Sequence, residues 1–551
     1  MNIRVVVSCL LIILAHPLHA IRFSPNKDLL PNRTYVISKN IDLKNSTIII
    51  PESCTLKFKR NGRLDNGTIV GQDTRIIAPL SVIFGEDIKF KGSFSCAIEY
   101  EWLYDSVCDI KNKIININGN HYTVSEAVGS NQWDNFLNVF NRIVGPFKEL
   151  HFNKSYVLNN PNGYTSTKNN QCVITTRVED LKISGGVIYN AGLCFLNWNN
   201  IEISNITILG RYHNYDRFVT SMTWDEMYRD QGELLCFSTV GIALSSPSSK
   251  ASVNSCAVLK NIHIEGAYNG IYIGRWDGEG REVATVSDVV VSDCVVNHTI
   301  YHAYASCNCK NVAFYNNKGA NSYLGMFIDI SRGSINVRCE GGEGRNFPQP
   351  FKIANNLNYA PTKNCSLTNN IIEISEMISG FKSGRDIIIS GCGTHVISGN
   401  QINYKNSVNT LFTLTDYTDL HLQIKENYIS GYLPNVLFRV LITNNYPNVK
   451  ISAEVLQNVI TGVPETDNTY LVVVDEQRTD TVGLYSFDLS INKNIFNTND
   501  SKQIFNVMRS QGKYPGNLYG SIKCSDNYYG PYVTLVSTDY LRMGNNLILE
   551  Y

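Results

Sequence analysis

The sequence predicts a right-handed parallel β-helix, an all-β solenoid, and a repeated strand pattern is the first reason. Short β-branched alternations recur along the chain, whereas long helical patterns are nearly absent. Most steps between neighbouring alternations are 20 to 33 residues, around a base period of about 22 to 23, which is typical of one solenoid coil per repeat. The aligned alternations begin at Leu181, Ile201, Ile262, Val289, Val312, Ile335, Cys365, Ile387, Leu420 and Val449.

An asparagine that follows the same strand is the second reason. Asparagine tolerates the left-handed backbone of a sharp corner, and stacked amides can hydrogen-bond from coil to coil. The asparagines of this pattern are Asn205, Asn370, Asn400, Asn427, Asn458, Asn494 and Asn527. A ladder of this kind resembles that of the pectate-lyase superfamily, over roughly residues 150 to 530. The Trp-Ile-Asp-His signature of pectate lyases and the Gly-His-Gly, Asn-Thr-Asp, Asp-Asp and Arg-Ile-Lys motifs of polygalacturonases are absent.

The first 20 residues are typical of a secretory signal peptide. Arg4 precedes an apolar run from Val5 to Ala15, and Leu18-His19-Ala20 is an acceptable cleavage site. The run is too short to span a bilayer, and the sequence offers no other transmembrane candidate. We therefore expect a secreted, periplasmic or cell-surface protein.

Four further segments are expected after the signal peptide. Residues 21–100 form β-rich turns, similar to the leading turns of secreted β-helix proteins of gut Bacteroidetes. Residues 101–150 form a segment that connects the leading turns to the main β-helix or caps it. One helix is expected in it over 131–145, where apolar residues are spaced by three and four. Residues 151–530 form the parallel β-helix, and residues 531–551 form a C-terminal cap.

Charge and cysteine content limit the classes of partner and cofactor. The 48 basic and 48 acidic side chains balance, so no general field attracts nucleic acid. The 15 cysteines follow no disulfide-framework spacing, and buried thiols are expected. Cys307-Asn308-Cys309 is too tight for the usual zinc pair. The sequence shows no clear metal motif and identifies no cofactor, although it leaves open whether a calcium ion binds. It also leaves the oligomeric state open.

The third strand of each coil carries the predicted catalytic residues. Asp329, Lys352 and Lys382 each lie 17 residues after the start of an aligned strand. Equal offsets predict one outward column on successive coils, about 4.8 Å apart per step. A parallel outward column two residues earlier is expected to hold the rings of Tyr272, Tyr304 and Phe327.

Aromatic rings beside charged groups suit a carbohydrate, because ring faces pack on sugars while polar groups fix their orientation. Long polar loops at 211–231 and 275–282 are expected to flank this sheet. Further candidates for substrate binding are Arg275, Trp276, Asp277, Glu279, His302 and Arg385. The alternative interpretation of the two columns is a solvated face of the sheet, and the alternative interpretation of His302 is a structural histidine.

Three functions follow from these residues. A polysaccharide lyase acting on a uronate-containing glycan needs a base and a cation for the uronate carboxylate, and Lys352 crowded by Lys382 supplies the base. Arg275, Arg332 or Arg385 could hold the carboxylate. A glycoside hydrolase instead needs two carboxyl groups, such as Asp329 with Asp277 or Glu279. A non-catalytic glycan-binding or surface β-helix protein needs neither a lysine base nor a pair of carboxyl groups.

Overall fold

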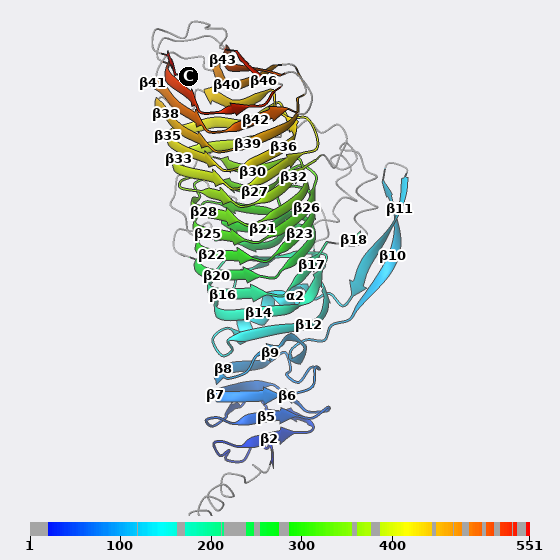
Figure 1. The fold of residues 1–551 in the computed structure, drawn as a ribbon. Helices are drawn as coiled ribbons and strands as arrows, with labels where there is room; N and C mark the ends of the chain where they lie inside the picture. Colours follow the sequence, from blue (N-terminus) through cyan, green and yellow to red (C-terminus); the bar gives the residue numbers. More distant parts are fainter. Residues whose placement is uncertain are drawn as a thin grey trace, which may run out of the picture.

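The chain is a long stack of β-strands with an α-helix near its N-terminal third (Figure 1). This description rests on a computed structural model. The structure describes residues 20–117, 120–161, 171–210, 212–213, 238–246, 254–274, 286–354, 361–375, 386–442, 448–464, 466, 468–476, 484–498, 503–511, 518–531, 533–536 and 547–550. The predicted signal peptide thus lies outside the described residues, apart from Ala20.

Small parallel sheets of short strands form the N-terminal part. Tyr35, Leu56 and Ile76 stand in register on neighbouring strands and are buried, so each turn of the chain places one apolar side chain inside. The strands are β1 (Ile21–Arg22), β2 (Thr34–Ile37), β3 (Asn40–Asp42), β4 (Thr47–Ile49), β5 (Thr55–Phe58), β6 (Arg63–Asp65), β7 (Gly67–Ile77) and β8 (Ile88–Phe94).

Helix α2 (Trp133–Ile143) lies inside the range 131–145, so the prediction of a helix there is confirmed. Its apolar residues recur every three or four positions and are buried. Phe136 stacks on Phe152 of β12 (Glu149–Val157) with 5.1 Å between ring centroids, and Phe140 meets Phe195 edge-on at 5.7 Å. The helix therefore covers apolar side chains at the N-terminal end of the main solenoid. β9 (Ile98–Glu99) and the short 3-10 helix η1 (Tyr100–Trp102) precede it.

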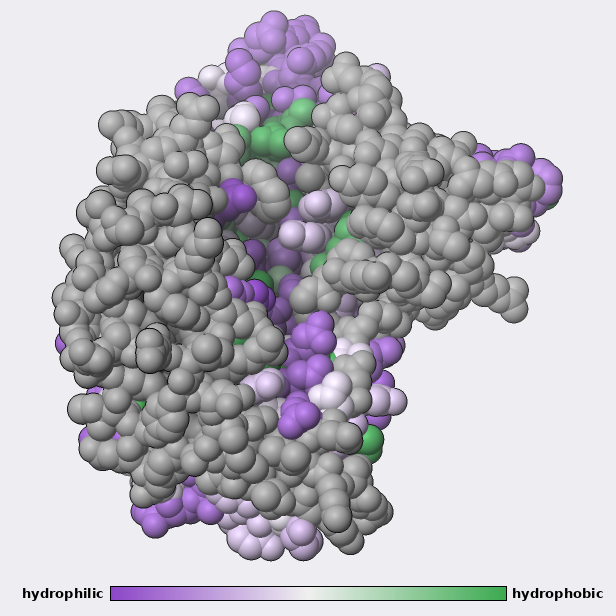
Figure 2. Space-filling view, turned by 90° about the horizontal axis from the view of Figure 1, so that it is seen from above, coloured by the Kyte–Doolittle hydropathy of each residue, from purple (hydrophilic) through white to green (hydrophobic). Residues whose placement is uncertain are grey.

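A hairpin projects sideways from the body. β10 (Cys108–Ile117) and β11 (Asn120–Gly129) pair antiparallel, and β11 also pairs with β18 (Tyr212–His213). The hairpin lies to the right of the stack in Figure 1 and projects to the same side in the end view of Figure 2.

Three parallel sheets, each contributing one strand per coil, form the main solenoid. The first sheet contains the N-terminal part of β14 (Val178–Tyr189), β16 (Trp198–Ser204), β20 (Asn254–Lys260), β22 (Val286–Ser292), β25 (Cys309–Tyr315), β28 (Ile335–Glu340), β31 (Ser366–Thr368), the later parts of β33 (Ile387–Ser398) and β35 (Thr410–Lys425), β38 (Asn448–Leu456), β41 (Leu484–Asn492), β44 (Leu518–Ser525) and β47 (Leu547–Glu550).

The second sheet contains the end of β14, β17 (Thr207–Leu209), the start of β21 (His263–Gly274), β23 (Val295–Thr299), β26 (Lys318–Ser322), β29 (Glu343–Phe347), β32 (Ile371–Ile374), β34 (Gln401–Tyr404), β36 (Tyr428–Leu433), β39 (Val459–Pro464), β42 (Ile495–Thr498) and β45 (Tyr528–Tyr529).

The third sheet contains β13 (Gln171–Ile174), β15 (Gly192–Phe195), β19 (Ser238–Leu244), the end of β21, β24 (Tyr304–Cys307), β27 (Met326–Ser331), β30 (Gln349–Ala354), the starts of β33 and β35, β37 (Val436–Ile442), β40 (Asn468–Glu476), β43 (Gln503–Gln511) and β46 (Val533–Val536). Because β46 and β47 continue the parallel pairing, the solenoid extends past the end expected at residue 530.

The register of the first sheet departs from the sequence alignment in several coils. Val289 and Val312 are partners as predicted, but the next partner is Val337, two residues after Ile335. Ile387 belongs to the third sheet, where it pairs with Phe412. Turns of unequal length cause these shifts. The alternation of side chains could not predict them, because it does not distinguish positions two residues apart.

The asparagine ladder is confirmed over its last six predicted members. The side-chain amides of Asn370, Asn400, Asn427, Asn458 and Asn494 each donate to the Oδ1 atom of the next member, ending at Asn527, over 2.8–3.0 Å.

The left-handed residue is the one before each ladder position, as at Asn369 with φ 57° and Gly399 with φ 66°. Asn205 has φ 56° and bonds Asn261 at 2.7 Å, so it occupies this outer corner and not the ladder.

The described cysteines carry free thiols, and most are buried. Within the part of the chain that the structure describes, no helix has the length and apolar character needed to cross a membrane.

Candidate functional site

A pocket of about 260 Å³ lies on the outer face of the third sheet, over β21, β24, β27 and β30. Its walls combine aromatic rings, two cations, one carboxylate and one imidazole. The residues that line it are Tyr268, Tyr272, Tyr301, His302, Cys307, Asp329, Ser331, Arg332, Lys352 and Ala354.

One outward column forms the base of this pocket. Tyr272 pairs with Ala305, Ala305 with Asp329, and Asp329 with Lys352. The predicted adjacency of Asp329 and Lys352 is therefore confirmed. Their equal sequence offset was nevertheless a coincidence, because Lys352 lies 15 residues after Val337, the true strand position.

The third residue predicted for this column is not there. Ile388 pairs with Lys352 and fills the position expected for Lys382. The prediction failed because the chain between β32 and β33 is longer than in the preceding coils. Lys382 itself lies outside the described residues, as do Arg275, Trp276, Asp277, Glu279, Arg385 and most of the two flanking loops.

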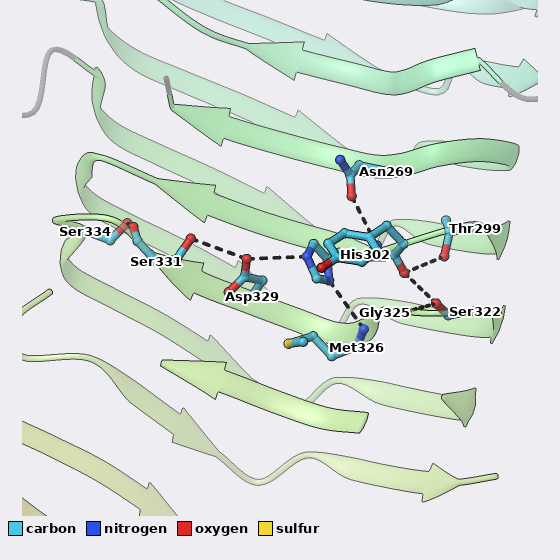
Figure 3. A network of polar contacts seen from close by, with 10 residues as sticks. Asn269, Thr299, His302, Ser322, Gly325, Met326, Asp329, Ser331 and Ser334 are labelled. Atoms are coloured by element: carbon cyan, nitrogen blue, oxygen red, sulfur yellow. Dashed lines mark hydrogen bonds and ion pairs between the residues drawn. The ribbon is translucent and has the colours of Figure 1, made fainter. Parts of the chain in front are cut away.

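Asp329 and His302 face each other across neighbouring coils (Figure 3). Oδ2 of Asp329 lies 3.4 Å from Nε2 of His302, and it accepts a hydrogen bond from the Ser331 hydroxyl at 3.3 Å. Oδ1 of Asp329 is buried and has no hydrogen-bond partner. A buried carboxylate oxygen without a partner costs free energy, and such costs are concentrated at functional sites.

The tautomer of His302 follows from its two contacts. Nδ1 accepts the N–H of Met326 at 3.4 Å, so Nε2 carries the proton and donates toward Asp329. Burial lowers the pKa of His302 to about 4, with Asp329 opposing the shift and Lys352 adding to it. His302 is therefore neutral at pH 7 and does not itself offset the negative charge of Asp329.

The turn that carries His302 is held by its backbone. Its N–H donates to Oδ1 of Asn269 at 3.1 Å, and its carbonyl accepts the N–H of Gly270 at 3.0 Å. The carbonyl of the preceding residue, Tyr301, accepts the hydroxyls of Thr299 and Ser322 (Figure 3). Four backbone and side-chain groups thus hold the turn that carries the imidazole.

The predicted column of three exposed rings is wrong. Tyr272 faces outward and lines the pocket, but only 4% of it is exposed. Burial raises the pKa of Tyr272 well above its usual value, so its hydroxyl stays protonated. The Tyr304 ring points into the core, because Tyr304 pairs with Ile271 and Ile328, which both face inward.

Phe327 also lies in the core, next to Ile328. Two successive residues reach the core here because glycines in β29 and in the turn before it leave room for the ring. A Cβ atom on Gly342 would lie 2.7 Å from the Phe327 ring, and one on Gly344 would lie 3.0 Å from it. Tyr304 and Phe327 therefore cannot contact a substrate on the outer face.

Two tyrosines that the sequence alignment did not single out form the aromatic wall. The rings of Tyr268 and Tyr301 stack with 5.7 Å between centroids and 19° between planes, and both are half-buried. They stand at equivalent places in Tyr268-Asn269-Gly270 and Tyr301-His302-Ala303, one coil apart. This repeat of aromatic, polar and small residues before the third strand was the signal in the sequence.

The cations of the pocket are Lys352 and Arg332, both half-buried. Arg332 has a left-handed backbone, with φ 53°, at the end of β27. With one carboxylate and a neutral imidazole, the described lining carries a net charge of +1 (two cations minus one anion). Among the described residues no group of three histidine, cysteine or acidic side chains could hold a metal ion.

No protein-family model matches the chain, and no curated protein matches it. Among solved structures, the A-module of a mannuronan C-5 epimerase from Azotobacter vinelandii is similar, with 10% identity, a TM-score of 0.42, and coverage of 77% of this chain and 96% of that chain. PfbA, a surface adhesin of Streptococcus pneumoniae, shows 12% identity, a TM-score of 0.39, and coverage of 76% and 93%.

A DFA-IIIase from Arthrobacter chlorophenolicus without its lid shows 10% identity, a TM-score of 0.39, and coverage of 66% and 89%. Proteins of one fold can differ in activity, so the reaction has to be argued from the pocket. The chain itself, with three parallel sheets that share each coil, is a right-handed parallel β-helix protein.

Proposed function

We propose that the protein is a secreted polysaccharide lyase that acts on an acidic, uronate-containing glycan in the pocket of the third sheet. One observation carries the proposal: a single pocket combines Lys352 and Arg332 with Asp329 and a stacked tyrosine pair. A base, a carboxylate-binding cation and a sugar-packing surface are the three parts that such an elimination needs.

The size and charge of the pocket support an acidic sugar. A volume of about 260 Å³ is below the range of about 300–1,000 Å³ typical of drug-sized ligands, which fits one sugar unit of a longer chain. The net positive lining favours a carboxylate, and the planar guanidinium of Arg332 can bind both of its oxygens. The half-buried rings of Tyr268 and Tyr301 offer an apolar wall for the sugar ring.

In the proposed step, Lys352 is the base that takes the C5 proton of the uronate. The electron pair of that C–H bond forms the C4–C5 double bond as the C4–O4 bond breaks. The leaving O4 atom takes a proton from the lysine ammonium just formed. Arg332 stabilises the charge that develops on the carboxylate.

Neighbouring residues hold the carboxylate of Asp329 in a fixed place. His302 and Ser331 hold Oδ2 of Asp329, so His302 is a positioning residue and not the base. Ile388 takes the place that was expected for a second lysine, so Arg332 is the other cation in the described lining.

The two alternatives have less support. A hydrolase needs two carboxyl groups about 5 to 9.5 Å apart, and Asp329 is the one carboxylate in the described lining. A binding module needs no buried carboxylate oxygen without a partner, such as Oδ1 of Asp329.

The test is a panel of uronate polymers, including alginate, polygalacturonate, chondroitin sulfate and xanthan, incubated with the full mature chain. We expect one polymer to yield products with the ultraviolet absorbance of an unsaturated uronate. Reducing ends that appear without this absorbance would indicate hydrolysis and overturn the proposal. Binding of a polymer without any cleavage would indicate a binding module instead.

A further inference from the structure

The second sheet exposes apolar side chains in five of its last six described coils. The structure describes eight large, exposed hydrophobic residues after residue 150, and two of them, Val173 and Val258, lie elsewhere. The other six are on the second sheet: Ile371, Tyr428, Tyr432, Val463, Ile495 and Tyr528. Scattered exposed hydrophobics need no explanation, but a group on one sheet does.

Most of these residues form a single outward column. Strand pairing places Ile371, Gln401, Tyr428, Val459, Ile495 and Tyr528 on successive coils, and we call these six residues the outer stripe. Five steps of about 4.8 Å give a length of roughly 24 Å. Strands β32, β36, β39 and β42 lie above one another in Figure 1.

The outward direction of the stripe is set by the core. The next residue on five of the six strands is buried: Ile372, Ile402, Ile429 and Phe496 are 1% exposed, and Ile460 is 3% exposed. A slip by one residue would expose these core side chains, so the stripe cannot turn inward. Tyr428 is 46% exposed and Tyr528 is 59% exposed.

A polar column runs beside the stripe. Two residues further along the strands, Asn403 pairs with Ser430, and Thr461 pairs with Asn497. Glu373 precedes them in the column, and its carboxylate pairs with Lys405 at 3.6 Å. The ring faces therefore adjoin amides and hydroxyls without an uncompensated charge among these residues.

The dimensions of the stripe fit a slender partner better than a second protein. The four exposed apolar side chains of the stripe, Ile371, Tyr428, Ile495 and Tyr528, are 39–59% exposed and offer roughly 400 Å², because a large aromatic buries about 150–250 Å² in full. A stable protein interface buries about 800 Å² on each partner. The stripe is also one side chain wide, and Tyr432 and Val463 form a separate exposed pair beyond the polar column, whereas a protein surface would need several adjoining apolar columns.

We propose that the outer stripe binds an extended, uncharged glycan chain that lies parallel to the solenoid axis. Tyr428 and Tyr528 are three coils apart, about 14 Å, so one chain can pack its sugar faces on both rings. Asn403, Ser430 and Asn497 then accept and donate hydrogen bonds to sugar hydroxyls. This surface is on the second sheet, so it is independent of the pocket and of the lyase proposal.

The test uses three neutral hexasaccharides, cellohexaose, xylohexaose and mannohexaose, whose length matches the stripe. Binding to the full mature chain is measured by isothermal titration calorimetry. At least one should bind, and the double variant Tyr428→Ala/Tyr528→Ala should weaken its binding about tenfold or more, since it removes both ring contacts. The variant Tyr428→Phe, which keeps the ring, should bind within about twofold of wild type.

Val258→Ala is the matched control, because Val258 is exposed on the first sheet, and it should bind like wild type. Circular dichroism checks that each variant is folded. The proposal is overturned if no hexasaccharide binds, or if the double variant binds as tightly as wild type. It is also overturned if wild type sediments as a dimer and the double variant as a monomer, because the stripe is then a protein interface.

Discussion

The imidazole of His302 on one coil faces the carboxylate of Asp329 on the next, with 3.4 Å between Nε2 and Oδ2. The pair joins the tyrosine wall to the Asp329–Lys352 column, because Tyr301 precedes His302 in the chain and Lys352 pairs with Asp329. Its neutral imidazole orients the carboxylate without cancelling its charge. The chemistry proposed for the pocket depends on this arrangement.

Lys352→Met should lower turnover on the cleaved polymer by at least about a hundredfold, the lower end for general acid–base catalysis. Methionine keeps the length of the side chain and removes the amine. The measurement is the initial rate of unsaturated uronate formation. Lys310→Met, at an exposed position of the first sheet, is the control and should keep the wild-type rate. A near-normal rate for Lys352→Met would exclude a lysine base.

Tyr301→Ala should raise KM about tenfold with a smaller change in kcat. The ring packs on Tyr268 at the pocket wall, so its loss removes contact with the sugar and leaves the reacting groups in place. Steady-state kinetics on the same polymer give both constants. Tyr315→Ala, on the first sheet, is the control. An unchanged KM for Tyr301→Ala would mean that the wall does not bind substrate.

Tyr304→Phe should lower the free energy of unfolding by about 1–3 kcal/mol without changing KM. The Tyr304 hydroxyl is buried and lies 2.6 Å from the carbonyl of Lys318 and 2.9 Å from that of Cys294. Removing it leaves those carbonyls without this donor. Urea unfolding measures the loss. A raised KM with unchanged stability would instead place the ring in the pocket, against its burial in the core.

Asn458→Ala should destabilise the solenoid by about 2–4 kcal/mol, because several hydrogen bonds are lost in a buried place. Its amide donates to the carbonyl of Ile424 at 2.9 Å and to Asn494 at 2.9 Å, and its Oδ1 accepts from Asn427 at 2.8 Å. Chemical denaturation gives the difference. Asn403→Ala, on the outer face of the second sheet, should cost less than about 1 kcal/mol. Equal costs at the two positions would contradict a structural role for the ladder.

His395→Asn should reduce the loss of stability on acidification. Burial lowers the pKa of His395 to about 4 from 6.5, so the unfolded chain takes up a proton first as the pH falls. The stability is therefore complete above pH 6.5 and declines toward pH 4, by up to about 3 kcal/mol. Asparagine can still accept the N–H of Cys365, which lies 3.1 Å from Nδ1.

Urea unfolding at pH 7 and pH 4.5 measures this effect. The difference between the two pH values should be smaller by about 1–3 kcal/mol in His395→Asn than in wild type. His421→Asn, at a half-buried position of the same sheet, should leave the difference closer to that of wild type. An unchanged difference in His395→Asn would mean that His395 does not titrate in this range.

Local sequence determined the elements of this protein. Alternating β-branched residues predicted strands, an apolar spacing of three and four predicted helix α2, and recurring asparagines predicted the ladder from Asn370 to Asn527. These features depend on neighbours a few residues away or on one repeated hydrogen bond. The side chain pattern of a strand also has a period of two, which separates inside from outside.

Tertiary structure alone decided which residues share a coil position. Turns of unequal length shift the register between coils, so Ile388 replaced Lys382 beside Lys352, and Tyr304 fell among inward residues. The glycines that admit the Phe327 ring to the core lie on other coils. The alternation of a strand determines which face of the sheet a side chain lies on, but not which residue lies beside it on the next coil. Core packing and interstrand hydrogen bonds determine both. The pocket is built from residues that are neighbours across coils, so the sequence pattern could not identify it.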